Sequence, residues 1–139
     1  MIAPATPDDA AAVVALWQRC DLTRPWNDPH ADFARALTGA TSTVLLARDD
    51  GDVIGSVMVG HDGHRGWIYY LAVTPDLQGQ GIGRALFAAA EDWLRDAGAP
   101  KVQLMVRSDN AAALGFYAAI GLARQDVVVL GRFLTDAVP

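Results

Sequence analysis

The sequence has little of several features that define other classes of protein. Its 139 residues include one cysteine, Cys20, so no disulfide can form within the chain and we expect a reducing, cytoplasmic compartment. No apolar run approaches the roughly 18 residues of a membrane helix, and the first residues do not form a secretory signal. Lysine and arginine form no cluster and the net charge is −5, which argues against nucleic acid as a main partner.

The composition that remains is typical of one globular domain. Hydrophobic residues make up 52% of the chain and charged residues 19%, so the chain can bury an apolar core. A chain of this length fits a single domain, 1–139, that buries roughly two-thirds of its unfolded surface. The sequence contains no linker, no internal repeat and no low-complexity segment beyond its richness in alanine.

Hydrophobic periodicity and turn signals predict strands alternating with helices. We expect strands at 2–5, 43–48, 53–59, 67–73 and 102–106, with two short strands after residue 121. We expect helices at 6–20, 28–39, 81–97 and 110–120. This order predicts an α/β layered fold with a mixed sheet, in which residues 67–106 form a right-handed parallel crossover.

A glycine-rich segment joins the predicted strand 67–73 to the next helix. Gly79, Gly81 and Gly83 leave the backbone bare at a helix start, which exposes about four unpaired N–H groups and a partial charge of roughly +0.5. Without Cβ atoms in the way, an anion can approach these donors closely. The segment therefore predicts a site for a phosphate-bearing ligand, and the alternative is a tight turn with no ligand.

The spacing of these glycines does not fit two common phosphate motifs. The pattern G-x-G-x-x-G fails because its last position holds Arg84 or Leu86, depending on the register. The Gly-Lys-Ser/Thr triplet of a P-loop is missing. A dinucleotide-dependent oxidoreductase is therefore disfavoured. Arg84 opposes the helix dipole unless an anion binds beside it, although an exposed arginine there costs little.

A second motif runs from Ser108 to Leu122. Asn110 and Tyr117 are seven residues apart, and seven helical steps of about 100° bring them to one face of a helix. Asn110 can instead be the helix N-cap, and Tyr117 can serve packing alone. Because this motif and the glycine segment both follow strands, we expect them to meet in one crevice beyond the strands' carboxyl ends.

Together these motifs resemble those of the GNAT N-acetyltransferases. The pattern Val73-x4-Gln78-x-x-Gly81-x-Gly83 is similar to the acyl-CoA diphosphate loop of that family, and N-x-x-A-x-x-F-Y-x-x-x-G-L from Asn110 is similar to its second signature. Leucine stands at the last position, where phenylalanine is commoner. The runs C-D-L-T-R-P-W-N and G-H-R-G-W-x-Y-Y also resemble the YpeA-like bacterial subgroup. The resemblance covers the chain from Asp8 to about Phe133.

The resemblance implies a GNAT-like fold with a mostly antiparallel sheet, N-acetyltransferase activity, acetyl-CoA as cofactor, and roles for particular residues. Backbone groups of the strand end would bind the pantetheine arm, as a peptide adds to a strand edge, and these belong to Leu71, Ala72 and Val73. Asn110 would help to anchor the cofactor. Tyr117 would protonate the departing thiolate, because a phenol with a reference pKa of ~10 is protonated at neutral pH. Amides would hold the diphosphate in the segment Gln78, Gly79, Gln80, Gly81, Ile82, Gly83 and Arg84.

The sequence does not identify a base for the attacking amine. Many relatives carry a glutamate on the strand before the glycine segment, whereas the matching positions here hold Trp67 and Tyr69. At pH 7 an α-amine loses only about 1–1.5 kcal/mol to become neutral, and a lysine roughly 4–5 kcal/mol. The turn before the strand offers three candidates, unless they are simply solvated, and these are His61, Asp62 and His64.

The acceptor site is predicted in the loop between the first two helices, with Tyr69 and Asp62 contributing from the strand side. Arg24 can bind a carboxylate through two N–H groups and Trp26 can supply an aromatic wall. Asp21 or Asp28 can receive an ammonium. The alternative is a plain helix connection, in which Trp26 packs into the core and the acids cap the next helix.

The leading functional prediction is direct attack of a primary amine on acetyl-CoA. The acceptor is predicted to be a small amino-acid-like molecule or a peptide or protein amine. An acyl intermediate on Cys20 is not expected, because no histidine neighbours it in sequence. The alternative is a non-catalytic acyl-CoA-binding or protein-interaction module, which the missing strand carboxylate favours. The chain is expected to act as a monomer or a homodimer, without a metal.

Overall fold

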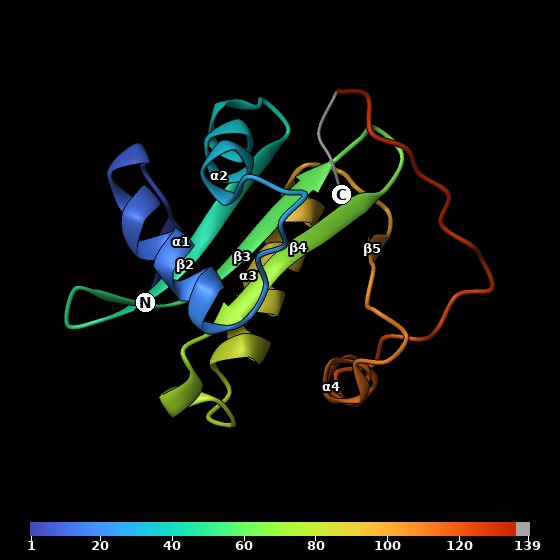
Figure 1. Ribbon diagram of the computed structural model, residues 1–139. Coiled ribbons are helices and arrows are strands. Elements are labelled where there is room, and N and C mark those ends of the chain that lie inside the picture. The colour runs from blue at the N-terminus through green and yellow to red at the C-terminus, as the bar shows by residue number, and fades with distance from the viewer. Residues whose placement is uncertain (136–139) are drawn as a thin grey trace. The chain divides into compact units, whose positions relative to one another are not determined.

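The computed structural model describes residues 1–135. The chain divides into two compact units, Met1–Leu104 and Met105–Pro139, and each is described by itself. Among the helices of the described residues, none combines the length and the apolar composition needed to span a bilayer. The elements of the first unit, most of them labelled in Figure 1, are β1 (Ile2–Pro4), η1 (Pro7–Asp9), α1 (Ala10–Arg19), α2 (Pro29–Thr38), β2 (Ser42–Asp49), β3 (Asp52–His61), β4 (Gly66–Val73), η2 (Pro75–Leu77), α3 (Ile82–Asp96) and β5 (Val102–Leu104).

The first unit is built around one mixed sheet with strand order β1-β2-β3-β4-β5. Neighbouring strands are antiparallel except β4 and β5, which are parallel and joined through α3. The predicted mixed sheet and its parallel pair are therefore confirmed. In Figure 1, α1 and α2 cover one face of the sheet and α3 covers the other.

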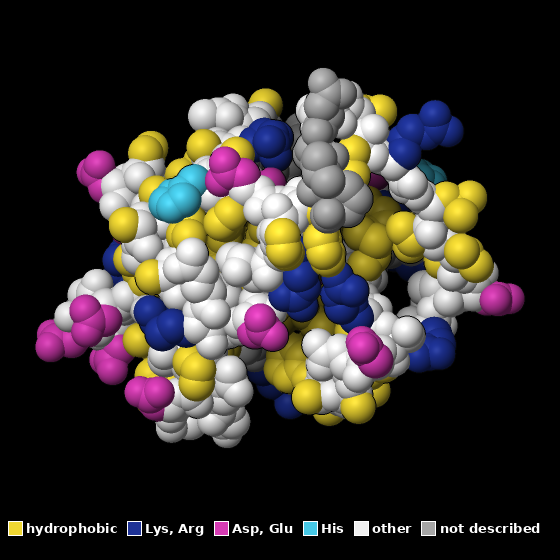
Figure 2. All heavy atoms as spheres, viewed as in Figure 1, with side chains coloured by type: hydrophobic (Ala, Val, Ile, Leu, Met, Phe, Trp, Pro, Cys, Tyr) yellow, Lys and Arg dark blue, Asp and Glu magenta, His cyan; other side chains and the backbone are white. Residues whose placement is uncertain are grey.

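Each face of the sheet carries its own apolar layer, as the alternation of side chains along a strand requires. On the α1 and α2 face, the buried cluster contains Val13, Leu16, Trp17, Phe33, Val44 and Leu46. The buried side chains of α3 are Leu86, Phe87, Ala90 and Leu94. Fully burying one side chain of this size stabilises the fold by about 1.5–3 kcal/mol, so these layers dominate its stability. On the face that Figure 2 shows, acidic side chains lie in small separate groups.

Local signals set the ends of several elements as predicted. The Asp28 carboxylate caps α2 by accepting the N–H groups of His30 at 3.0 Å and Ala31 at 3.2 Å, and Pro29 occupies the first turn. Asp50 and Gly51 both have positive φ, at 51° and 84°, in the two-residue turn between β2 and β3. This is the conformation that an Asp-Gly hairpin turn requires.

The second unit contains one helix, α4 (Ala111–Ala119), within its described residues. The prediction of two further strands was wrong for residues 122–135, which form neither strand nor helix. Val128 and Leu130 in this segment are 84% and 90% exposed. An apolar, β-branched sequence favours a strand only where a partner strand supplies hydrogen bonds and packing. β5 also ends at Leu104, two residues before its predicted end.

Candidate active site

The glycine segment follows β4 and η2 and leads into α3. Gly79 has φ of 82° and Gly81 has φ of 86°, in the left-handed region that costs other residues about 1–2 kcal/mol. A Cβ atom added to either glycine would meet no heavy atom within 4 Å. Glycine is therefore needed here for its backbone conformation, and the space beside the segment is open.

The N–H groups of residues 79–84 have no hydrogen-bond acceptor within residues 1–135. The first helical bond of α3 runs from the Ala85 N–H to the Gly81 carbonyl at 3.0 Å, which leaves the preceding amides unused. Their donors add to the positive end of the helix dipole. This open, donor-rich backbone fits the diphosphate of coenzyme A.

The Val73 carbonyl ties the glycine segment to the end of β4. It accepts hydrogen bonds from the Gln78 side-chain Nε2 at 3.1 Å and from the Cys20 thiol at 3.2 Å. Burial raises the pKa of the Cys20 thiol, which keeps it protonated. A protonated thiol that donates to a carbonyl is a poor nucleophile, which agrees with the expectation that Cys20 carries no acyl group.

The end of β4 presents a free edge within the first unit. β5 pairs with β4 only from Gly66 to Ile68, so residues 69–73 have no partner strand on that side within Met1–Leu104. Thr74 donates to the Ile54 carbonyl, and Val73, one residue before it, lies opposite Gly55. The N–H and C=O groups of successive residues point to opposite sides of a strand. Because the Thr74 N–H points toward β3, the N–H and C=O of Val73 point away from β3, toward the free edge. The Val73 N–H is therefore placed as pantetheine binding by a strand edge requires.

A β-bulge interrupts β4 within this edge. Ser56 lies opposite Ala72 and Met58 opposite Tyr69, so Val57 alone faces two residues of β4. The extra residue is Tyr70, whose φ of 50° is unusual for a residue with a side chain.

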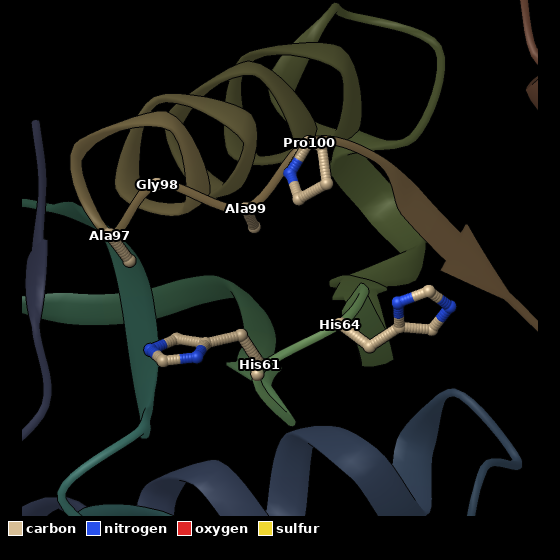
Figure 3. Close-up of a pocket in the computed structure, with 7 residues that line it drawn as sticks. His61, His64, Ala97, Gly98, Ala99 and Pro100 are labelled. Atoms are coloured by element: carbon tan, nitrogen blue, oxygen red, sulfur yellow. The ribbon is translucent and has the colours of Figure 1, made fainter.

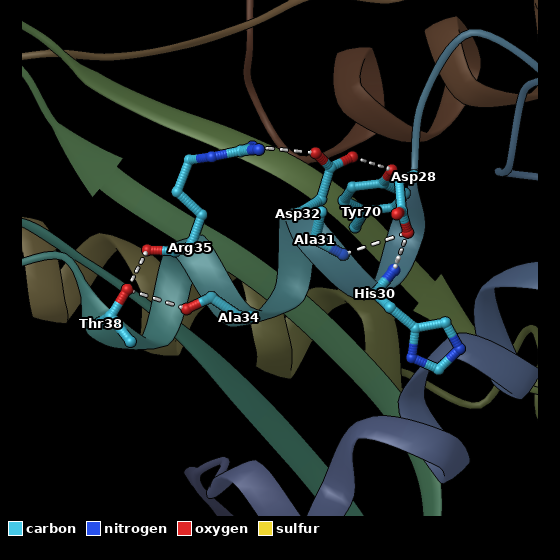
Figure 4. A network of polar contacts seen from close by, with 8 residues as sticks. All are labelled: Asp28, His30, Ala31, Asp32, Ala34, Arg35, Thr38 and Tyr70. Atoms are coloured by element: carbon cyan, nitrogen blue, oxygen red, sulfur yellow. Dashed lines mark hydrogen bonds and ion pairs between the residues drawn. The ribbon is translucent and has the colours of Figure 1, made fainter.

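Three contacts hold Tyr70 in this conformation, and a fourth fixes one of its partners. Its ring stacks on that of Trp17 with centroids 3.8 Å apart, and its hydroxyl donates to Asp32 Oδ2 at 2.8 Å (Figure 4). Its carbonyl accepts from the Ser56 hydroxyl at 3.0 Å, and that hydroxyl accepts from Trp17 Nε1 at 2.9 Å. Hydrogen bonding to Asp32 and burial both raise the pKa of the Tyr70 phenol, burial more so. Tyr70 is therefore a donor and not a base.

The predicted acceptor loop makes mostly local contacts. Arg24 donates to the carbonyls of Asp21 and Thr23, both at 2.8 Å, so its guanidinium is turned into its own loop. The Asp21 side chain is 98% exposed. Asp28 caps α2, as expected if the loop is a plain connection between helices. Trp26 is half-buried.

The turn between β3 and β4 uses Asp62 to hold its own backbone. The carboxylate accepts the N–H groups of His64 and Arg65 at 2.9 and 2.7 Å, and Trp67 Nε1 at 3.0 Å. These bonds lower the pKa of Asp62 to about 2, which makes it a weak base. Burial and the charge of Asp62 together raise the pKa of Tyr69, which is 45% exposed.

His61 and His64 belong to the same turn and line a pocket of about 130 Å³ together with the residues after α3 (Figure 3). This pocket lies at the carboxyl end of α3, whereas the glycine segment lies at its amino end. A 15-residue helix is about 22 Å long. The three base candidates of this turn are therefore remote from the glycine segment.

In the second unit, the α4 motif has the local structure that its sequence indicated. The Asn110 side chain caps α4 by accepting the Ala113 N–H at 3.1 Å, which is the capping alternative. Tyr117 is half-buried, and burial raises the pKa of its phenol to about 12. Its ring meets that of Phe116 edge-on, with centroids 5.1 Å apart.

Residues 11–122 match the acetyltransferase (GNAT) family. The chain belongs to this family. It is similar to an acetyltransferase of Pectobacterium atrosepticum, with 47% identity over 129 residues that cover 93% of this chain and 92% of that protein. The predicted family is thus confirmed, and the protein is an acetyl-CoA-dependent N-acetyltransferase. The narrower resemblance to the YpeA-like subgroup stays a prediction.

Solved GNAT structures share the fold of this acetyltransferase. An aminoglycoside acetyltransferase, AAC(6')-Iy, in complex with a CoA-containing bisubstrate analogue, superposes with a TM-score of 0.81 at 18% identity, covering 97% of this chain and 98% of that one. The Escherichia coli ribosomal-protein-S18-alanine N-acetyltransferase gives a TM-score of 0.73 at 26% identity, covering 87% and 76%.

Proposed function

We propose that this acetyltransferase moves the acetyl group of acetyl-CoA to a primary amine of a small amino-acid-like molecule or of a peptide or protein, by direct attack of the amine on the thioester. The observation that carries the proposal is the run of N–H groups without protein acceptors at residues 79–84, next to the free edge of β4. An α-amine is the favoured acceptor, because it becomes neutral at pH 7 at a cost of about 1–1.5 kcal/mol. The relative named for the alanine of ribosomal protein S18 is in keeping with that class.

Backbone groups would provide most of the cofactor binding. The amides of residues 79–84 would hold the diphosphate, and the free edge at Leu71–Val73 would pair with the pantetheine arm. Because the Val73 carbonyl already accepts two donors, the Val73 N–H is the group left for this pairing. Gln78 acts here through its side chain, which fixes the start of the glycine segment against β4. Asn110, at the start of α4, would help to anchor the cofactor.

Tyr117 would serve as the proton donor in the reaction. Acetyl-CoA supplies an acetyl group activated as a thioester; the nitrogen–carbon bond forms as the carbon–sulfur bond breaks. The Tyr117 phenol would donate its proton to the departing sulfur, the acceptor nitrogen would lose its proton to water, and the tyrosinate would regain a proton from water. A pKa of about 12 keeps this phenol protonated throughout the neutral range, so its proton is always present.

A panel of amines tests this function. Purified protein is mixed with acetyl-CoA and with glycinamide, trialanine amide or Nα-acetyl-lysine amide, and release of the CoA thiol is followed. We expect faster release with the two α-amines than with the lysine side chain, in line with their reference pKa values. Binding of acetyl-CoA by calorimetry without thiol release for any of these acceptors would contradict the proposal.

A further inference from the structure

We propose that Asp32, held in place by Tyr70, receives the ammonium group of the acceptor. The inference rests on the proposed function and names the part of the first unit that recognises the amine. Tyr70 ends the run G-H-R-G-W-x-Y-Y, whereas Asp32 belongs to no motif of the sequence. The structure brings them together from α2 and from the bulge of β4, 38 positions apart in the chain.

The first support is the polar chain that holds Tyr70 inside an apolar layer. Ser56 is the one fully buried polar side chain among residues 1–135, and it links Trp17 Nε1 to the Tyr70 carbonyl. Buried polar groups weaken a core unless every member is satisfied, as it is here. These hydrogen bonds bury no additional apolar surface, but they fix the position of the Tyr70 backbone and ring.

The second support is the backbone conformation of Tyr70. A non-glycine residue with φ of 50° is strained. Such a conformation persists only where the surrounding contacts impose it, and residues of this kind cluster at functional sites. The strained residue lies just beyond Ile68, where β5 stops pairing with β4, and just before Leu71. The bulge therefore presents the Tyr70 hydroxyl, and the carboxylate bound to it, beside the edge where the acetyl-bearing arm would lie.

The third support is the state of the Asp32 carboxylate. Its Oδ2 accepts the Tyr70 hydroxyl and its Oδ1 accepts Arg35 at 3.2 Å (Figure 4), and its side chain is still 24% exposed. A carboxylate offers about four acceptor positions, so capacity remains for an ammonium donor. The Arg35 side chain is 74% exposed, and an exposed ion pair of this kind contributes little and is easily displaced.

The carboxylates that the sequence offered for the acceptor site are used differently. Asp28 caps α2 and Asp62 holds the turn before β4. The Asp21 side chain is 98% exposed and lies 3.8 Å from the Arg24 guanidinium. Asp32 is the one of these four whose carboxylate is bound to a β4 side chain at the bulge.

Asp32→Asn tests the role, because asparagine can still accept the Tyr70 hydroxyl but carries no charge. The assay uses whichever of glycinamide, trialanine amide and Nα-acetyl-lysine amide the wild-type protein acetylates fastest. We expect the KM of that amine to rise by about tenfold or more, with the KM of acetyl-CoA changed by less than about twofold. Asp92→Asn is the matched control, because Asp92 forms the same i,i+3 pair with Arg95 on α3, at 2.9 Å, and should change neither constant.

Tyr70→Phe keeps the charge and removes only the hydroxyl, and we expect a rise of about threefold in the KM of the amine. Thermal melts establish that each variant is folded. An amine KM within twofold of wild type in Asp32→Asn, or an equal rise in both KM values, would overturn the inference. If Asp32→Asn does not fold, an unchanged amine KM in Tyr70→Phe overturns it instead. Absence of thiol release by wild-type protein with all three amines counts against the proposed function itself, and calorimetry with coenzyme A still reports cofactor binding in that case.

Discussion

Substitution of Gly81 by alanine separates the two uses of this glycine, its backbone conformation and its open space. Gly81 has φ of 86° and Gly98 has φ of 84°, and an added Cβ meets nothing within 4 Å at either position. Alanine in this region costs about 1–2 kcal/mol, partly offset by about 0.4–1 kcal/mol of lost freedom in the unfolded chain. Both Gly81→Ala and Gly98→Ala should therefore lower stability by about 1 kcal/mol, or about 2–8 °C in Tm.

The two variants should differ in their affinity for coenzyme A. At position 81 the new methyl group would occupy part of the open space beside the glycine segment, and we expect it to keep an anion from some of the amides of residues 79–84. Loss of one charge-assisted hydrogen bond costs about 1.5–3 kcal/mol, which corresponds to an increase of about 10–100-fold in Kd. Gly98 lies at the other end of α3, about 22 Å away, and Gly98→Ala should bind as the wild type does.

Isothermal calorimetry with coenzyme A, together with thermal melts, measures both effects. Equal Kd values for Gly81→Ala and wild type would refute the placement of the diphosphate at this segment. Equal weakening in both variants would show that the effect comes from stability alone. A larger fall in Tm for Gly81→Ala than for Gly98→Ala, measured without ligand, would instead show that the segment makes contacts that the open space does not reveal.

Three further predictions concern the proton donor, the turn before β4 and the acceptor. Tyr117→Phe should lower kcat by about 10–100-fold with little change in the KM of acetyl-CoA, and an unchanged kcat would remove its role as acid. Because the pKa of Tyr117 is raised from about 10 to about 12, its contribution to stability is present below pH 10 and is lost as the pH rises toward 12, so Tyr117→Phe should flatten the fall in Tm over that range. Asp62→Asn should lower Tm at pH 7, because the pKa of Asp62, lowered to about 2, reflects hydrogen bonds that favour the charged carboxylate. The difference in Tm from wild type should shrink as the pH falls from 4 to 2. The kcat of Asp62→Asn should stay within about threefold of wild type, and a larger fall would indicate that Asp62 is the base. For wild type, kcat/KM should rise with pH up to the acceptor's own pKa, so a plateau near pH 8 indicates an α-amine and one near pH 10 a lysine.

Local sequence signals were enough to predict one helix start, one hairpin turn and the glycine segment. The Asp28-Pro29 cap, the Asp50-Gly51 turn and the glycine segment before α3 each depend on backbone conformations that few residue types adopt. Such features act over a few neighbouring residues, so a pattern in the sequence is sufficient to indicate them.

The contact between Asp32 and Tyr70 was not predictable in this way. It joins α2 to β4 across 38 positions, and Tyr70 adopts a left-handed conformation that its own preferences oppose. Only tertiary packing on Trp17 and bonding through Ser56 make that conformation stable. The strands expected after α4 failed for a related reason, because the sequence of residues 127–130 favours a strand but cannot supply its partner.

The order of the elements already indicates that the histidine and aspartate candidates of the turn before β4 lie far from the glycine segment, and their role as a base stays a prediction. That turn precedes β4 and the glycine segment follows it, so the two lie at opposite ends of one strand, and eight residues span about 23–27 Å. The proposal instead assigns acceptor binding to an element that packs across β4 near its middle. In the first unit, α2 meets β4 there through Asp32.

Backbone atoms bind the cofactor in this proposal, whereas side chains recognise the acceptor. The amides of residues 79–84 and the N–H of Val73 depend on main-chain geometry, which most side-chain substitutions leave intact. The ammonium site at Asp32 depends on one carboxylate and on the tyrosine that holds it. The two affinities should therefore vary independently, and a change at Asp32 or Tyr70 should alter which amine is used without altering the use of acetyl-CoA. Coupled changes in both KM values across a set of substitutions in α2 and β4 would show that the bulge at Tyr70 supports the cofactor edge as well as the acceptor.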